Sequence, residues 1–339
     1  MGHGWLGVDL FFVLSGFLIT GILLDAKGKP EYFKTFYARR FFRIMPLYFT
    51  MVAIWSVFYR GYAGYFLLSS VFMANLAPAF HVRVPNGPST LWSLAIEEQF
   101  YLVWPWLVLL TSRRRLALVG ISIVALEPVI RAIHAAHGLH PQLIYNLTWC
   151  RCDGLAMGAL FALWVRSDSF SRMASRKAAF ALLSALAVLT VIGYPFGLMG
   201  TYTIAGTSLR YTQAYLFYAA FFGLILAYQG SFWTAPLRWK LMRVSGALSY
   251  CLYLIHGSVG KVFERFIGHF LSISLRTTVI RGVVMISVSF LFAATSKRFL
   301  EDPCTLLKER LFPVQRTEPV STTPQQAFMH TKESAGSAA

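Results

Sequence analysis

Apolar segments long enough to cross a bilayer alternate with short polar loops along most of the chain. A helix of about 18 to 20 apolar residues spans the roughly 30 Å hydrocarbon core of a membrane. Segments that reach or approach this length lie near residues 6–24, 41–59, 92–110, 115–134, 152–166, 178–197, 212–229, 246–267 and 277–296. The pattern predicts an all-α fold, a polytopic transmembrane helical bundle of about nine spans.

One further apolar stretch, residues 62–80, is interrupted by Gly, Asn and Pro. The distribution of basic loops decides how to interpret it, because cytoplasmic loops carry an excess of Lys and Arg. Basic clusters follow the spans 6–24 and 92–110, and both fall inside only if 62–80 does not cross the membrane. We therefore expect an interfacial or re-entrant segment at 62–80, and a cytoplasmic C-terminus.

The ends of the chain carry two further expectations. An odd number of spans places the N-terminus outside, although no basic flank or signal segment precedes the first span to direct it there. The simplest explanation is that one helix upstream is missing, so that residues 1–310 form an N-terminally incomplete membrane domain. Residues 311–339, rich in Pro, Ser, Thr and Gln, predict a disordered cytoplasmic tail.

Composition supports the membrane assignment and excludes other classes. Of 339 residues, 56% are hydrophobic and 13% charged, and the mean hydropathy is +0.56. The formal net charge of +17 fits basic loops and anionic lipid in a membrane protein, so no nucleic-acid partner is expected. The four cysteines form no CxxC pair, and the chain has no GxSxG, P-loop or HExxH motif, so we expect no metal site.

Ionisable residues inside predicted spans are costly and call for an explanation. In TLWSLAIEEQFYLVWPW (90–106), Ser93, Glu97, Tyr101 and Trp104 recur on one helical stripe, with Glu97 roughly 9 Å below the outer end. We predict a catalytic role for Glu97. The alternative interpretation is that Glu97 lies in the first turns of the helix and complements the helix dipole. The same interpretation is open for its neighbour Glu98.

A second stripe lies in SGALSYCLYLIHGS (245–258), where Ser249, Tyr253 and His256 share one face. Counting from the cytoplasmic end, His256 lies roughly 20 Å into the membrane, at a depth similar to that of Glu97. An acid–base pair in one cavity would need this placement. The alternative is that His256 is a hydrogen-bonded packing residue.

The segment FYARRFFRIMPLY (36–48) places Arg39, Arg40 and Arg43 at the cytoplasmic mouth of a span. Guanidinium groups suit phosphate, so a nucleotide-bearing donor is one candidate ligand. A plain positive-inside anchor is the other interpretation of these charges.

The opening span contains Asp9, Ser15, Gly16 and Thr20. Asp9 is a candidate functional acid or a helix-dipole partner, and Gly16 with Thr20 fits a small-residue packing face.

Two other polar groups are consistent with structural roles. Glu127 and Arg131 stand four residues apart and predict an ion pair within one span. Arg151 and Asp153 mark the outer start of another span, in which Gly154 and Gly158 predict a close-packing face. A border of an acceptor groove is the alternative interpretation of Arg151 and Asp153.

Taken together, six of these stretches resemble the acyltransferase-3 family of integral membrane O-acyltransferases. In the family's order they are GWLGVDLFFVLSGFLIT, FYARRFFRIMPLY, TLWSLAIEEQFYLVWP, RCDGLAMGAL, SGALSYCLYLIH and RFLEDP, and they cover residues 4 to about 310. The resemblance implies a ten-helix bundle in the bacterial cytoplasmic membrane. It also implies transfer of an acyl group, often acetyl, from cytoplasmic acyl-CoA as co-substrate. The implied acceptor is a hydroxyl of an extracytoplasmic glycan or lipid-linked sugar.

The resemblance also implies roles for individual residues. The acyl-CoA pair is matched by Arg40 and Arg43, with Arg39 beside them, and the substrate-contacting elements by Ser15, Trp92, Ser93 and Tyr101. Glu97 would orient or tune a base, Tyr253 or His256 would polarise the carbonyl or position the acceptor, and Asp9 joins this catalytic set. The family's first helix, with its basic residue and His, is absent here, so His3 receives no role.

Two alternative functions remain at this point. The first is a non-catalytic transporter or flippase for a sugar lipid or acyl donor. The chain shows neither an inverted repeat nor paired broken helices, which are typical of transporters. The second is an acyltransferase inactivated by truncation.

Overall fold

A computed structural model describes residues 5–200, 202–266 and 275–312, and all the regular structure in these ranges is helical. The predicted tail therefore lies almost entirely outside the described residues, as does His3. The longer helices are α1 (Trp5–Ala26), α2 (Tyr32–Phe58), α4 (Leu91–Leu110), α5 (Arg113–Ala136), α7 (Cys152–Val165), α8 (Arg172–Gly193), α9 (Ile204–Ala227), α10 (Lys240–Phe266) and α11 (Leu275–Ser296). The shorter helices are α3 (Ala63–Ser70), α6 (Pro141–Asn146) and α12 (Asp302–Leu311).

The all-α prediction is confirmed, and the chain is a multi-pass membrane protein. Within the described residues, five helices are long and apolar enough to cross a membrane: Leu6–Ala26, Tyr32–Phe58, Arg113–Ala136, Arg172–Gly193 and Thr278–Leu311. The other predicted spans are also helical. Of these, α7 has only 14 residues, and charged and hydroxyl side chains interrupt the apolar sequence of α4, α9 and α10.

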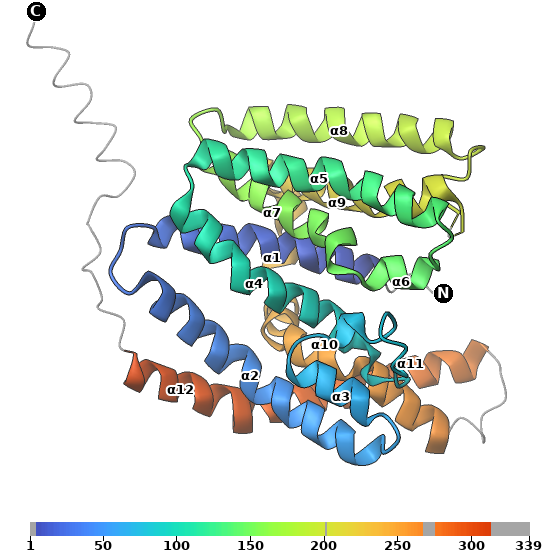
Figure 1. The fold of residues 1–339 in the computed structure, drawn as a ribbon. Helices are drawn as coiled ribbons and strands as arrows, with labels where there is room; N and C mark the ends of the chain where they lie inside the picture. The colour runs from blue at the N-terminus through green and yellow to red at the C-terminus, as the bar shows by residue number, and fades with distance from the viewer. Residues whose placement is uncertain (1–4, 201, 267–274, 313–339) are drawn as a thin grey trace, which may run out of the picture.

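The helices form two packed groups with α4 at their junction (Figure 1). In the first group, α1, α5 and α9 surround α7, and α8 packs on α9. In the second group, α10 packs on α11, and α2 packs on α3 and α12. Helix α4 contacts α1 of the first group, and it also contacts the 3₁₀ turns Ala74–Leu76 and Pro88–Thr90, which pack beside α3 and α10 of the second. The polar stripe of α4 therefore lies inside the bundle.

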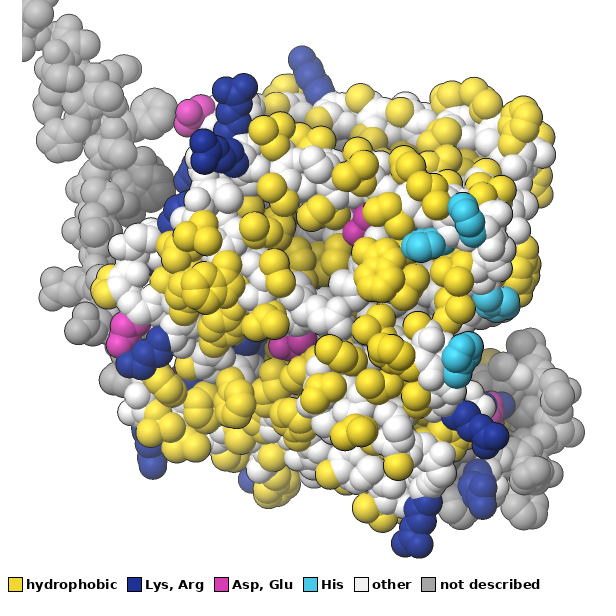
Figure 2. All heavy atoms as spheres, in the orientation of Figure 1, with side chains coloured by type: hydrophobic (Ala, Val, Ile, Leu, Met, Phe, Trp, Pro, Cys, Tyr) yellow, Lys and Arg dark blue, Asp and Glu magenta, His cyan; other side chains and the backbone are white. Residues whose placement is uncertain are grey.

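The outer surface suits a hydrocarbon environment. Large apolar side chains such as Leu102, Leu110, Val191 and Leu291 are well exposed. Figure 2 shows a broad hydrophobic band between the two ends of the molecule. Basic side chains gather where α4 meets α5, while histidines near α6 and a further group of basic side chains, at the lower right of Figure 2, lie at the opposite end. Exposed apolar surface of this extent is expected where lipid, rather than water, is the solvent.

The contact between α1 and α7 is very close because glycines face the neighbouring backbone. A Cβ atom on Gly16 would lie 2.0 Å from the carbonyl oxygen of Leu155, and one on Gly158 would lie 2.0 Å from that of Val13. Small residues let membrane helices approach to backbone contact. The predicted packing roles of Gly16 and Gly158 are confirmed.

Residues 62–80 contain α3 and the short 3₁₀ turn Ala74–Leu76. A helix of eight residues is about 12 Å long, well short of the hydrocarbon core. Side-chain amides fasten this segment to the bundle. Asn75 donates to Thr148 Oγ1 at 2.9 Å and accepts from Gln99 of α4 at 3.1 Å.

Enlarging Gly16 to Leu should separate α1 from α7 and destabilise the protein. Overpacking of a dense interior usually costs about 1–3 kcal/mol, and this contact is with backbone that cannot rotate away. We expect a thermal unfolding midpoint in detergent several degrees below that of the wild type. Gly7→Leu is the matched control, because a Cβ on Gly7 of the same helix meets nothing within 4 Å. Equal midpoints for the two variants would contradict the role of this contact.

Candidate active site

A buried carboxylate with two hydroxyl partners lies between α1 and α4. Glu97 is only 4% exposed, and both Ser15 of α1 and Tyr101 of α4 donate hydrogen bonds to its Oε1. The two hydroxyl groups also contact each other. These three residues form a compact cluster, called here the Glu97 cluster, in which the carboxylate is satisfied by neutral donors.

The helical spacing of α4 explains the position of this cluster. Ser93, Glu97, Tyr101 and Trp104 recur on one stripe, and all four are buried. One helical turn beyond Tyr101, Trp104 Nε1 donates to Thr20 Oγ1 of α1 at 2.8 Å. The predicted stripe is therefore a buried face that α4 presents to α1.

Arg40 of α2 reaches the Glu97 cluster from the second helix group. Its Nη1 lies 3.4 Å from the Tyr101 hydroxyl, and its Cζ lies 4.6 Å from the centroid of the Tyr101 ring. Arg39 and Arg43 of the same helix are exposed, whereas Arg40 is half-buried. Because α2 already begins at Tyr32, these arginines lie within the helix and not at its first turn.

Tyr253 of α10 extends the polar stripe in the other direction. Its hydroxyl lies 2.5 Å from Ser93 Oγ, one turn before Glu97 on α4. Its ring stacks on Phe11 of α1, with centroids 5.9 Å apart. The sequence placed Ser249 on the same face, but Ser249 is exposed and donates to the carbonyl of Gly246 in its own helix.

The structure does not bring His256 together with Glu97. The imidazole is exposed, and its Nδ1 lies 2.7 Å from the carbonyl oxygen of Tyr253 in the same helix. The Tyr253 and His256 rings are 5.7 Å apart. Instead of a direct acid–base pair, the structure has Ser93 and Tyr253 in contact one helical turn from Glu97.

Asp9 forms an ion pair with Arg151 of α7, and both side chains are completely buried. The guanidinium group lies among aromatic rings, with its Cζ 4.2 Å from the centroid of Tyr211 and 4.7 Å from that of Tyr145. Trp92, predicted to contact substrate, belongs to this cage at 5.8 Å and packs against Tyr145. The pairing accounts for a charged Asp9 inside an apolar helix.

A second buried ionic network joins α5, α7 and α9. The predicted pair of Glu127 and Arg131 is confirmed at 3.7 Å. Arg131 also donates to Asp153 at 2.9 Å and to the carbonyl oxygen of Ser208 at 2.9 Å. Asp153 accepts from Thr212 Oγ1 at 2.5 Å, and its amide donates to Glu127 at 2.9 Å. These contacts support the structural interpretation of the residues.

Sequence reasoning missed the tyrosine cage and the link between Asp9 and Arg151. The signal was present, because an acid and a base both lay near the outer ends of predicted spans, where each required an opposite charge. Local sequence does not determine which helices pack together, so it associates Arg151 with its neighbour Asp153 and not with Asp9. The cage residues Tyr145, Tyr211 and Tyr215 carry no motif and become neighbours only in the fold.

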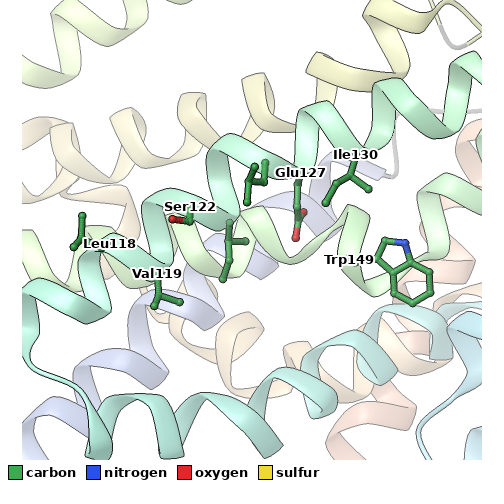
Figure 3. A pocket seen from close by; sticks show the side chains of 8 residues that line it. Leu118, Val119, Ser122, Glu127, Ile130 and Trp149 are labelled. Atoms are coloured by element: carbon green, nitrogen blue, oxygen red, sulfur yellow. The ribbon is translucent and has the colours of Figure 1, made fainter.

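Two open grooves lie on the outside of the bundle. One, of about 440 Å³, is lined by α5 side chains and Trp149 (Figure 3). The other, of about 750 Å³, lies between α2 and α3. The Glu97 cluster lines neither groove. Across the described ranges, no three His, Cys, Asp or Glu residues gather as a metal site.

The fold is that of a helical membrane protein with a buried polar face, and sequence comparison gives its class. The acyltransferase-3 family profile, described as "Acyltransferase domain", matches residues 4–295. The chain belongs to this family of membrane acyltransferases.

Similar proteins come from several bacteria. The peptidoglycan O-acetyltransferase OatA of Listeria monocytogenes is 28% identical over 88% of this chain and 51% of its own length. The protein YrhL of Bacillus subtilis is 31% identical over 75% of this chain and 44% of its own. The O-acetyltransferase OatA of Staphylococcus aureus is 27% identical over 89% and 53%. This chain thus spans about half the length of these relatives. No solved structure matches it.

Breaking the pair of Asp9 and Arg151 from one side should destabilise the protein strongly. Removing one partner of a buried ion pair costs about 3–5 kcal/mol, because the other charge is left uncompensated. We expect Arg151→Met to lower the thermal midpoint in detergent more than the double variant Asp9→Leu/Arg151→Met, which removes both charges. A double variant that is less stable than the single one would contradict this account.

Proposed function

We propose that this chain transfers an acyl group, most simply acetyl, from cytoplasmic acyl-CoA to a hydroxyl of an extracytoplasmic glycan or lipid-linked sugar. Membership of the family supports acyl transfer. The names of the OatA relatives support an acetyl group, and that of the Listeria protein supports a peptidoglycan-like acceptor.

One observation carries the proposal. Buried polar side chains on one stripe of α4 lie between the arginine face of α2 and the part of α10 that carries the exposed imidazole of His256. Arg40 contacts Tyr101, which together with Ser15 holds Glu97. One turn earlier on α4, Ser93 contacts Tyr253, whose carbonyl oxygen lies beside the imidazole of His256. A reaction whose donor and acceptor lie on opposite sides of a membrane needs polar groups along such a route.

The donor would bind at the arginine face of α2. Arg39 and Arg43 are exposed and have no hydrogen-bond or ion-pair partner within the described residues. Planar guanidinium groups bind phosphate in two-pronged geometry, which suits the phosphates of acyl-CoA. Acyl-CoA is a co-substrate in this scheme.

The orientation follows from the charged loops. We propose that residues 1–310 form one membrane-embedded acyltransferase domain in the bacterial cytoplasmic membrane, with about nine spans and the C-terminus inside. Successive long helices run in alternating directions in Figure 1, and α3 is too short to cross. The basic end of the molecule would face the cytoplasm, and residues 62–80 would re-enter or lie at the opposite interface.

The chemistry is the exchange of a thioester for an ester. The acceptor oxygen attacks the acyl carbonyl carbon and loses its proton, while the carbon–sulfur bond breaks and the CoA thiolate leaves and is protonated. Glu97, held by Ser15 and Tyr101, would orient the general base that takes the proton of the acceptor hydroxyl. Tyr253 and His256 would position the acceptor and polarise the carbonyl.

A transporter or flippase would move a sugar lipid or acyl donor without forming an ester. The deciding measurement uses membranes from cells that make the protein, incubated with acetyl-CoA labelled in the acetyl group. We expect an alkali-labile acetyl ester on envelope glycan that is missing from a gene-deletion strain. Label that enters vesicles without ester formation would support transport instead.

Glu97→Gln should impair the chemical step while keeping the size of the side chain. Loss of a positioned acid–base group typically lowers the rate by about 10²–10⁴-fold, and an orienting role predicts the lower end of that range. We expect kcat for acetyl transfer to fall about 10²-fold, with Glu309→Gln, an exposed change on α12, as the control. A near-normal rate for Glu97→Gln would exclude it from the site.

Tyr253→Phe and His256→Ala should weaken use of the acceptor. Each removes a polar group from the outer part of the stripe, so we expect a higher KM for the glycan acceptor and little change in KM for acetyl-CoA. Ser249→Ala serves as the control, because Ser249 is exposed on the same helix and bonds only within it. Unchanged acceptor kinetics in both variants would argue against a role for this end of α10.

A further inference from the structure

The three arginines of α2 differ in what their side chains contact. Arg39 and Arg43 are exposed, whereas Arg40 is half-buried and lies over the Tyr101 ring at 4.6 Å. Arg40 and Arg43 stand three residues apart, so they are neighbours on one side of the helix. Their different surroundings therefore come from the elements packed against α2 and not from helical position alone.

Arg40 is placed to offset the electrostatic cost of burying the Glu97 carboxylate. Within the described residues Glu97 forms no ion pair, and its partners are the hydroxyl groups of Ser15 and Tyr101. A buried carboxylate held only by neutral donors is costly in a medium of low dielectric constant. Arg40 is the cation in contact with that cluster, and it acts through Tyr101, whose hydroxyl it approaches at 3.4 Å.

The contact also fixes the phenol. A cation over an aromatic face is attracted by the electrons of the ring, most strongly where water is excluded. Tyr101 is only 2% exposed, and its hydroxyl faces both the carboxylate and Arg40. Moving Arg40 outward to a phosphate would remove this contact from the cluster.

We propose that the arginines of α2 have two separate roles. Arg40 is a positioning residue for the Glu97 cluster, and Arg43, together with Arg39, binds the donor phosphates. This inference rests on the proposed acyl transfer and goes beyond it by separating two residues that the sequence treats alike. Arg40 is thereby part of the route through the membrane, and Arg43 is part of its cytoplasmic entrance.

Steady-state kinetics with acetyl-CoA as the varied substrate should separate the two roles. We expect Arg43→Ala to raise KM for acetyl-CoA about tenfold or more with kcat within about twofold of wild type. Arg40→Ala should lower kcat about 10²-fold with KM nearly unchanged. Arg40→Lys, which keeps the charge but lacks the planar group, should recover part of kcat. Arg114→Ala, an exposed change in α5, is the control.

A double-mutant cycle tests whether Arg40 acts through Tyr101. Because the two groups touch, Arg40→Ala combined with Tyr101→Phe should be little slower than the slower single variant. Additive losses of kcat would overturn the proposed route. So would an Arg40→Ala variant that raises KM for acetyl-CoA as Arg43→Ala does.

Direct binding of CoA distinguishes failure of this inference from failure of the proposed function. In detergent, Arg43→Ala should lose affinity for CoA, whereas Arg40→Ala should bind CoA as the wild type does, which also shows that this variant is folded. A wild type that binds CoA but transfers no acyl group would end the proposed function and leave the division of binding roles standing. Equal loss of CoA affinity in both variants would overturn the inference.

Discussion

A guanidinium group buried in an apolar bundle must find an opposite charge and a polarisable surface, and Arg151 finds both. Asp9 of α1 supplies the charge, and Tyr145, Tyr211 and other rings supply the surface. Since breaking such a pair would leave an uncompensated charge, the register of α1 against α7 is fixed at this point. The glycine contacts of α1 and α7 hold the same two helices at backbone distance. Because Ser15 lies further along α1, its position opposite Glu97 depends on this arrangement.

The interior of the bundle thus contains two kinds of polar group. The ionic networks around Arg151 and Arg131 are fully buried and pair charge against charge, which suits groups that hold helices together, although Asp9, Arg151 and Asp153 each keep a buried polar atom without a hydrogen-bond partner among the described residues. The Glu97 cluster has only hydroxyl partners and one cation at its edge, so its carboxylate is less firmly committed. A substrate that brings a charge or a proton near a carboxylate changes the energy of that carboxylate. The change is larger for a carboxylate without an ion-pair partner than for one already held in an ion pair. This contrast separates structural from candidate functional acids within one membrane domain.

Sequence patterns predicted much of this molecule for definite reasons. Long apolar segments must be helical inside a bilayer, since every backbone polar group has to be satisfied within its own segment. The spacing of Ser93, Glu97 and Tyr101 placed them on one face, and the spacing of Glu127 and Arg131 predicted their ion pair, which the structure contains. Element boundaries were less accurate. The helix α2 begins at Tyr32 because the aromatic and basic residues before 41 continue the helical pattern, although they are not a hydrophobic run.

By itself, therefore, the sequence determined the helical class, the membrane setting, the family and which side chains were unusual for a membrane. All of these depend on composition and local spacing. Only the tertiary structure decided which of those side chains meet: Asp9 with Arg151, Arg40 with Tyr101, and Tyr253 with Ser93 instead of His256 with Glu97. Each of these contacts joins helices far apart in the chain. Their pairing is set by which helices pack together and how far each is displaced along its axis, and local periodicity contains no information about either.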